Sequence, residues 1–156
     1  MILNNIRTNR RKEYFSMLIL NELSTFSPFI AGGAVRAWYA IEPIKDIDLF
    51  FKSEEQRQKA LNYLIGEKEA KLIFSNENVD KVSHKGKVFD FCKKYYDSPQ
   101  EAIDNFDFTV SMAAVNLEDS FFGEDFFMDL ASRRLAFNII PFYRTIKYLK
   151  KRIYNV

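Results

Sequence analysis

The stretch FIAGGAVRAWYAIEPIKDIDLFF, residues 29–51, decides the fold because two strand-like segments flank a glycine pair and a short helix-like segment. The apolar run FIA meets Gly32 and Gly33, and the next residues, AVRAWYA, have the composition of one or two helical turns. Further on, KDIDLFF alternates with a period of two. This alternation predicts that Asp46 and Asp48 project from one face of a strand whose other face is apolar.

Two carboxylates held this close repel each other, so at least one pKa should rise unless a cation lies between them. Mg²⁺ favours carboxylate oxygen and leaves room for phosphate oxygens and water. Asp90, in the segment VFDF, has the same apolar–Asp–apolar pattern and supplies a third ligand if the two strands are neighbours. Three such carboxylates suit two divalent ions, one activating an attacking hydroxyl and one steadying a leaving pyrophosphate. The sequence therefore predicts a Mg²⁺ or Mn²⁺ site at Asp46, Asp48 and Asp90.

Gly32 and Gly33 stand at the predicted strand-to-helix turn. Glycines there let the backbone approach a ligand closely, and N–H groups at a helix N-terminus attract phosphate. Arg36, one turn into the helix, can reach a phosphate as well. A glycine pair alone marks only a tight turn, and an Asp-x-Asp alone is commonly a solvated strand edge. Together with a second Asp-bearing strand, the combination favours a phosphate and metal site.

The remaining segments predict a single α+β domain over residues 1–156, with a mixed sheet backed by helices. Helical spacing and capping signals predict helices at residues 10–24, 54–66, 99–105 and 142–154. Beyond residue 70 we expect strands at 71–76, 79–84 and 86–96. The many phenylalanines between residues 106 and 127 are read as core rather than as a subunit contact.

Composition excludes several kinds of site. Cys92 is the only cysteine and His84 the only histidine, so neither a disulfide within the chain nor a Cys/His zinc site can form. His84 is expected to be exposed in a turn. The sequence contains neither a signal peptide nor an apolar segment long enough to cross a bilayer, so we expect a cytoplasmic protein without a membrane partner.

The net charge of +2 is too small to indicate nucleic-acid binding, but basic residues gather toward both ends of the chain. Each cluster alone reads as a solvated helix face, whereas two clusters of one sign favour a polyanionic partner. Phe, Trp and Tyr make up 16% of the residues. This fraction fits a core of bulky side chains, and exposed aromatic rings that stack on nucleic-acid bases are the alternative. The basic residues concerned are Arg7, Arg10, Arg11, Lys12, Arg133, Arg134, Arg144, Lys147, Lys150, Lys151 and Arg152.

This combination of motifs resembles the polymerase-beta-like nucleotidyltransferases, and among them the head domain of CCA-adding enzymes and bacterial poly(A) polymerases. Those families carry GG-x-V-R followed by D-x-D, which correspond here to residues 32–36 and 46–48. Residues 88–91 are similar to the strand with their third acidic position. Residues 106–114 are similar to their R-D-F-T-I-N-A segment, and residues 129–135 to the D-L…L-R stretch. The resemblance covers the expected core, residues 28–138.

The resemblance implies the polymerase-beta-like fold and transfer of a nucleoside monophosphate from an NTP, such as ATP, to a hydroxyl, with release of pyrophosphate. It implies that Asp46 and Asp48 bind metal and that Asp90 helps to activate the acceptor hydroxyl. Gly32 and Gly33 would hold the triphosphate with help from Arg36. Further nucleotide contacts are implied at three positions that also have plainer interpretations as a turn residue or as solvent-facing side chains: Asp107, Arg133 and Arg134.

Several departures from the family pattern bear on function. Ala37 stands where the family usually has an aspartate, and Asn105 and Phe106 replace an arginine pair. The helix that selects CTP and ATP has a degenerate counterpart at residues 140–144. With the chain ending at Val156, counterparts of the neck, body and tail domains are missing, so a complete CCA-adding enzyme is not expected.

Three hypotheses follow. The first is a Mg²⁺-dependent nucleotidyltransferase encoded by a phage or mobile element. Its acceptor would be an RNA 3′ end first, and otherwise a nucleotide or a protein, as in toxin and antitoxin members of the superfamily. The second is a nucleotide- or RNA-binding module without catalysis. The third is a structural or partner-binding α+β domain, in which Asp46 and Asp48 face solvent and Asp90 lies far from them. A distant Asp90, or a packed side chain that fills the gap between the three acids, would contradict an enzyme. The oligomeric state is left open.

Overall fold

The computed structural model describes residues 2–3 and 18–138 of the chain. The predicted helix at 142–154 and the basic residues at both ends, apart from Arg133 and Arg134, lie outside these residues. Of the predicted helix at 10–24, only the last part is described, and residues 18–22 are helical. The expected core, residues 28–138, falls entirely inside the described part.

The described strands form one eight-stranded mixed sheet, in the order β1-β8-β7-β2-β3-β6-β5-β4. β3 and β6 are parallel, and every other neighbouring pair is antiparallel. The α+β class and the mixed sheet backed by helices are confirmed. The strands are β1 (Ile2–Leu3), β2 (Phe29–Ala31), β3 (Asp46–Phe50), β4 (Lys71–Ser75), β5 (Val79–His84), β6 (Lys87–Cys92), β7 (Ala113–Val115) and β8 (Ser120–Phe122).

Side-chain caps explain where two of the helices begin. The Ser53 hydroxyl accepts the N–H of Gln56 at 3.2 Å, and the Ser98 hydroxyl accepts the N–H of Glu101 at 3.1 Å. Pro99 then occupies the first helical position, where its missing N–H costs nothing. The helices are α2 (Gly33–Tyr39), α3 (Glu54–Lys68), α4 (Pro99–Asp104) and α5 (Phe126–Ala131), with 3₁₀ turns η1 (Ser24–Phe26) and η2 (Thr109–Ser111).

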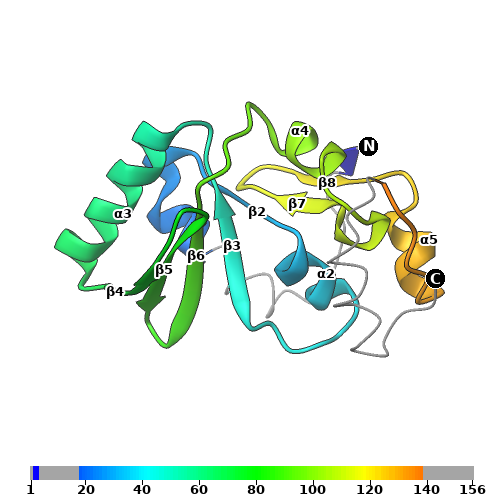
Figure 1. Cartoon of the computed structure of the whole chain (residues 1–156), viewed down its shortest axis with the longest axis horizontal. Helices are drawn as coiled ribbons and strands as arrows, with labels where there is room; N and C mark the ends of the chain where they lie inside the picture. The colour runs from blue at the N-terminus through cyan, green and yellow to red at the C-terminus, as the bar shows by residue number, and fades with distance from the viewer. Residues whose placement is uncertain (1, 4–17, 139–156) are drawn as a thin grey trace.

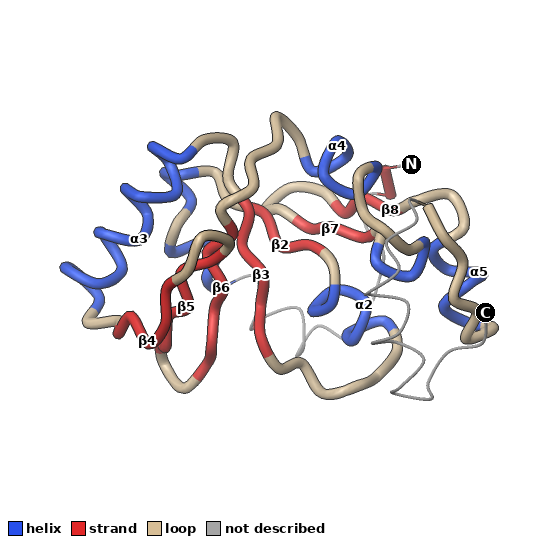
Figure 2. The backbone as a smooth tube through the Cα atoms, viewed as in Figure 1, coloured by secondary structure: helices blue, strands red, loops and turns tan. Residues whose placement is uncertain are grey.

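The parallel pair β3–β6 lies at the centre of the molecule (Figures 1 and 2). Parallel neighbours need a crossover connection. Here α3 and the antiparallel strands β4 and β5 provide it, and they lie together at one end of the molecule (Figure 1). α4 and α5 lie at the other end with β7 and β8. The crossover therefore brings β6, with its aspartate, beside β3.

The two faces of β3 belong to two hydrophobic clusters. Ile47 and Leu49 pack in the larger cluster, which includes Leu61 and Leu64 of α3. Phe50, on the opposite face, packs with Ala102 and Ile103 of α4. Asp46 and Asp48 lie on the same face as Phe50. α4 covers this face at Phe50, the C-terminal end of β3, and the two aspartates lie nearer the N-terminal end of the strand.

The burial predicted for the phenylalanine-rich region agrees with the structure, whereas the exposure predicted for His84 does not. Four of the phenylalanines between residues 106 and 127 are at least nine-tenths buried, as a core interpretation predicts: Phe108, Phe121, Phe122 and Phe126. The prediction of an exposed His84 is wrong. His84 ends β5 and is 5% exposed, because its ring packs near Phe89 and its Nε2 lies 3.1 Å from both carboxylate oxygens of Glu22. Within residues 2–3 and 18–138, no helix has the length and apolar character needed to span a membrane.

Candidate active site

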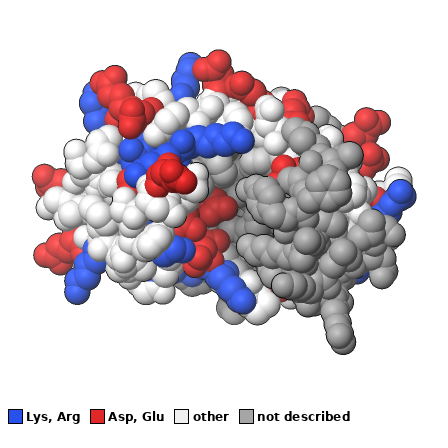
Figure 3. Space-filling view, in the orientation of Figure 1, with Lys and Arg blue, Asp and Glu red and all other residues white. Residues whose placement is uncertain are grey.

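Four charged side chains from three neighbouring strands line up on one face of the sheet. Asp48 of β3 lies opposite Asp90 of β6 in the parallel register, and Asp90 lies opposite Lys81 of β5 in the antiparallel register. Asp46 is two residues before Asp48 and therefore shares its face. In Figure 3 acidic side chains gather at the centre of the face that Figure 1 presents, with basic side chains beside them. The two Asp-bearing strands are thus direct neighbours.

The Lys81 ammonium lies between the carboxylates. Its Nζ is 2.7 Å from Oδ2 of Asp46, 3.0 Å from Oδ1 of Asp90 and 3.3 Å from Oδ2 of Asp90. The hydrogen bond to Asp46 and the charge of Asp90 raise the pKa of Lys81 against the opposing effect of burial, which keeps the ammonium charged. Oδ1 of Asp90 is buried and has the Lys81 ammonium as its ion-pair partner at 3.0 Å.

Asp48 is the carboxyl whose protonation is most altered. Its pKa is raised to about 7, first because burial disfavours the charged form, and then because Asp90 and Asp46 place negative charge nearby. Lys81 opposes this rise. Repulsion between Asp46 and Asp48 was expected from the sequence, but burial and Asp90 contribute more to the pKa of Asp48 than Asp46 does.

The donor set fits a divalent cation once the ammonium has moved away. Within the described residues, no group of three or more His, Cys, Asp or Glu side chains is already arranged to hold a metal. The three carboxylates nevertheless offer the hard oxygen ligands that Mg²⁺ prefers. They face a gap that already accommodates a cation, the Lys81 ammonium, 2.7 Å from Asp46 and 3.0 Å from Asp90. Asp46, Asp48 and Asp90 are therefore the residues that would hold Mg²⁺ or Mn²⁺.

The sequence reasoning missed Lys81, although a signal was present. The segment VDKVSH reads as a strand, and Lys85-Gly86 makes a tight turn before the strand that contains Asp90. Counting back from that turn places Lys81 opposite Asp90, as the antiparallel register shows. A lysine opposite the third carboxylate could therefore have been predicted from the hairpin.

The glycine turn connects β2 to α2. Gly32 has φ 81° and ψ −129°, a conformation open to glycine and strained for other residues. A Cβ at Gly32 would meet Phe106 only at 3.8 Å, so the backbone conformation is what requires glycine there. The Gly32 N–H donates to the Ala113 carbonyl at 3.0 Å. Gly33 is exposed, with nothing within 4 Å of its would-be Cβ, so it is the glycine that a ligand can approach.

Two of the predicted phosphate-binding arginines meet at one glutamate. Arg36 Nη1 is 2.8 Å from Oε2 of Glu42, and Arg133 Nη1 is 2.9 Å from Oε1 of the same residue. Burial would raise the pKa of Glu42, but the bonds and charges of Arg36 and then Arg133 hold it below its usual value. Glu42 stands in a loop without periodicity, and sequence reasoning missed it.

The other two predicted nucleotide contacts have simpler surroundings. Asp107 is half-buried in the bend before η2, and its carbonyl accepts the N–H of Asn138 at 2.7 Å. Arg134 is exposed, and its backbone N–H donates to the Asp129 carbonyl at 2.8 Å. Nucleotide contact at Asp107 and Arg134 stays a prediction, beside the plainer interpretations of a turn aspartate and a solvent-facing arginine.

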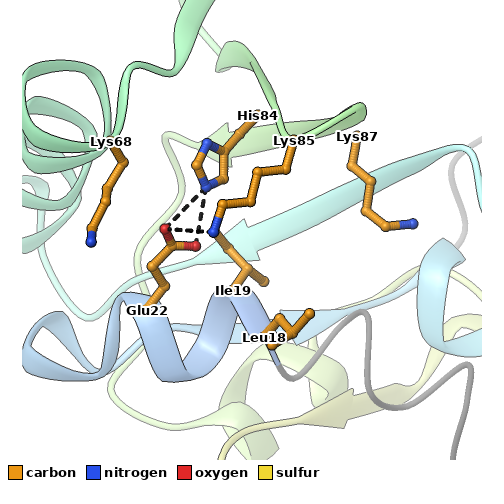
Figure 4. A pocket seen from close by; sticks show the side chains of 7 residues that line it. All are labelled: Leu18, Ile19, Glu22, Lys68, His84, Lys85 and Lys87. Carbon is orange, nitrogen blue, oxygen red and sulfur yellow. Dashed lines mark hydrogen bonds and ion pairs between the residues drawn. The ribbon is translucent and has the colours of Figure 1, made fainter.

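A cavity of about 470 Å³ lies away from the carboxylates (Figure 4). It is formed by the helical residues 18–22, the end of α3 and the β5–β6 hairpin. Phe89 and His84 project from the face of the sheet opposite to Asp90, so the cavity opens on that opposite face. Its central carboxylate, Glu22, is already contacted by His84 and Lys85. The cavity is therefore separate from the candidate site.

The fold is similar to that of solved tRNA-processing enzymes. A structure described as a tRNA-processing enzyme in its apo form aligns over 85% of this chain and 38% of its own, with a TM-score of 0.67 and 17% identity. The CCA-adding enzyme of Bacillus stearothermophilus in complex with CTP aligns over 81% and 33%, with a TM-score of 0.63 and 18% identity. A CCA-adding enzyme with ATP aligns over 85% and 37%, with a TM-score of 0.65 and 15% identity. At these identities the likeness shows the fold, which is that of the nucleotidyltransferase domains of CCA-adding enzymes.

The relatives found by sequence comparison are anti-defence proteins rather than tRNA-processing enzymes. A family profile described as Gabija anti-defense 2 family protein matches residues 5–133. The protein named Gabija anti-defense 2 from Bacillus phage SPbetaL7 is 29% identical over 161 aligned residues, which cover 92% of this chain. The chain spans only 38% of the length of that phage protein.

Proposed function

The chain belongs to the Gabija anti-defense 2 family, and from that membership and the site on β3 and β6 we propose that it is a metal-dependent nucleotidyltransferase domain. It transfers a nucleoside monophosphate from an NTP to a hydroxyl acceptor and releases pyrophosphate. An RNA 3′ end is the first candidate acceptor. Its role is to act against the Gabija defence, as the name of the phage relative states for that protein.

The observation that supports this proposal best is the placement of the three carboxylates. Asp48 and Asp90 are in register on parallel neighbours, with Asp46 on the same face. Three acids on one face of the central strands repel one another unless a cation lies among them, which favours a cation-binding site. Of the two observations that would count against an active site, a distant Asp90 is not seen, whereas a side chain in the gap, that of Lys81, is present.

Each residue has a part in this proposal. Asp46, Asp48 and Asp90 would hold the divalent cation, and Asp90 would also orient the acceptor hydroxyl and take up its proton. Gly33 offers open backbone to the triphosphate. Arg36 and Arg133, both already paired with Glu42, are placed to exchange that carboxylate for phosphate oxygens. When bound, Mg²⁺ would supply activation of the hydroxyl and stabilisation of the leaving pyrophosphate.

One observation favours a second candidate, a nucleotide-binding module without catalysis. The Lys81 ammonium fills the gap in which a metal would be held, so the carboxylates have a partner without any metal. Such a module would bind an NTP with the same affinity whether or not a divalent ion is present. An enzyme would show strong coupling between NTP and metal.

The test is nucleotidyl transfer by the full chain. We would incubate it with each α-labelled NTP, Mg²⁺ or Mn²⁺, and separate pools of RNA, nucleotides and protein. We expect label in one acceptor pool and stoichiometric pyrophosphate. The combined change Asp46→Asn and Asp48→Asn should lower the rate at least about 100-fold, because it removes the ligands that hold the cation.

The matched control is Asp125→Asn, an exposed aspartate before α5 whose side chain makes no capping bond. It should transfer label at the wild-type rate. Transfer that survives in the Asp46/Asp48 variant would contradict the assignment. If no label is transferred and NTP binds equally with and without Mn²⁺, the catalytically inactive module is the correct interpretation.

A further inference from the structure

We propose that Lys81 is a built-in counter-cation that competes with the divalent ion for Asp46 and Asp90, so that the metal binds well only together with the nucleotide. This inference rests on the proposed function, because it concerns the metal that the three carboxylates would hold. It assigns a positioning role to a residue outside the family motifs quoted for the resemblance. Lys81 would set when the site accepts metal, without taking part in bond making.

The geometry shows that ammonium and metal need the same oxygens. Nζ of Lys81 lies within 3.3 Å of one oxygen of Asp46 and both oxygens of Asp90. Mg²⁺ binds oxygen at about 2.0–2.1 Å, so it would have to lie in the same gap. Two cations there would repel each other strongly, because the site is partly shielded from water. Binding of the metal and retention of the ammonium are therefore mutually exclusive.

The ammonium can leave without a change in the backbone. Lys81 is fixed opposite Asp90 by the ladder between β5 and β6, but its charged head is at the end of a flexible stem. The side chain is 26% exposed, and that of Asp46 is 48% exposed, so the gap opens toward solvent on the Asp46 side. Rotation of the stem would release the carboxylates and keep the ammonium near any anionic group bound there.

Charge then makes metal binding depend on the nucleotide. In the free protein, a divalent ion can bind the carboxylates only if the contacts of Lys81 with Asp46 and Asp90 break. A bound NTP adds negative charge at the site, which helps to hold the metal and gives the displaced ammonium a new partner. By linkage, the NTP should tighten metal binding, and the metal should tighten NTP binding by the same factor.

The experiment measures Mn²⁺ binding by the full chain, using the electron paramagnetic resonance signal of free Mn²⁺. Titrations are done with and without a non-hydrolysable NTP analogue. Lys81→Met should bind Mn²⁺ without nucleotide roughly tenfold tighter or more, because the competing charge is gone. The tightening caused by the analogue should be smaller in this variant than in the wild type. Lys59→Met, which removes an exposed lysine of α3, should match the wild type.

Two further arms guard against misfolding. Lys81→Gln provides a second uncharged side chain if thermal unfolding shows that Lys81→Met is not folded. Lys81→Arg keeps a cation in the gap and should show no gain in Mn²⁺ affinity without nucleotide. The wild-type protein gives a third readout, because Mn²⁺ at saturating concentration should displace the ammonium and increase acylation of Lys81 by an amine reagent, as detected by mass spectrometry.

Unchanged or weaker Mn²⁺ binding by the uncharged variants would overturn the role of Lys81. If the wild type still transfers label from NTP in that case, the proposed function stands and only this inference fails. If neither the wild type nor Lys81→Met binds Mn²⁺, with or without the analogue, both proposals fail together.

Discussion

At the scale of single residues, the protonation state of each carboxyl in the site depends on whether a cationic side chain lies next to it. Asp46 and Asp90 share the Lys81 ammonium, whereas Asp48, deeper on the same face, has a raised pKa. Glu42 has the opposite surroundings, with an arginine on each carboxylate oxygen. The site therefore combines one carboxyl held ready to bind a proton with one held firmly ionised. Burial and Asp90 set the state of Asp48, and Arg36 and Arg133 set that of Glu42.

The raised pKa of Asp48 predicts a pH dependence of stability. An unfolded aspartate has a pKa near 3.8, so between about pH 4 and pH 7 the folded chain holds a proton that the unfolded chain has released. Stability must then fall as the pH rises through this range. For a pKa of about 7 the loss from this group is roughly 4 kcal/mol.

Asp48→Asn isolates this effect, since an amide does not titrate. Urea unfolding without divalent ions should show that the free energy of unfolding of the wild type, relative to Asp48→Asn, is higher at pH 5 than at pH 8. The same measurement on Asp125→Asn gives the background of an exposed aspartate. A difference between wild type and Asp48→Asn that stays constant with pH would contradict the burial of a titrating Asp48.

At the scale of elements, the connection between α3 and the sheet positions β6. Arg57 of α3 is 3% exposed, and its Nη1 lies 2.5 Å from Oδ2 of Asp80 on β5, which is also buried. Arg57 Nε donates to the Tyr95 hydroxyl at 3.0 Å. Burial raises the pKa of Asp80, but Ser75, Lys93 and Arg57 together hold it below its usual value. This buried ion pair joins α3 to β5, two elements of the connection between β3 and β6.

Arg57→Met should therefore destabilise the fold. Removing one member of a buried ion pair leaves a buried charge with less compensation, which costs about 3–5 kcal/mol. Asp80 keeps Ser75 and Lys93, so we expect the lower end of that range, measured by urea unfolding. Lys59→Met breaks an exposed pair on the same helix and should change stability by less than about 1 kcal/mol. Equal losses in the two variants would refute this role of Arg57.

The elements also show what could be predicted from the sequence and what could not. β3 was predicted because KDIDLFF alternates, and α3 and α4 because Ser53 and Ser98 cap them. Such signals are local, within a few residues. The contact of Lys81 with Asp90 could have been counted from the hairpin turn, but the pairs Lys81–Asp46, Arg36–Glu42, Arg133–Glu42 and Arg57–Asp80 join residues 6 to 91 positions apart and depend on strand order and loop path. No periodicity in the sequence encodes those distances.

At the scale of the whole molecule, the similar structures and the sequence family are named for different aspects of function in those proteins. The solved structures with this fold include CCA-adding enzymes with CTP or ATP, whereas the sequence family is named for action against Gabija. These aspects are compatible if the anti-defence activity works through nucleotidyl transfer. The alternative is that a nucleotidyltransferase fold acts by binding alone. Substitution of Asp46 and Asp48 can distinguish these two possibilities in cells.

We expect the chain, produced in bacteria that carry the Gabija defence, to restore plaque formation by a phage that the defence otherwise blocks. If transfer is the mechanism, the combined change Asp46→Asn and Asp48→Asn should return plaque formation to the level without the chain. Asp125→Asn should restore plaques like the wild type. Because the chain spans 38% of the phage relative, the full-length relative with matching changes is tested in parallel. Full restoration by the double variants, at equal protein levels, would show that counter-defence needs binding and not transfer.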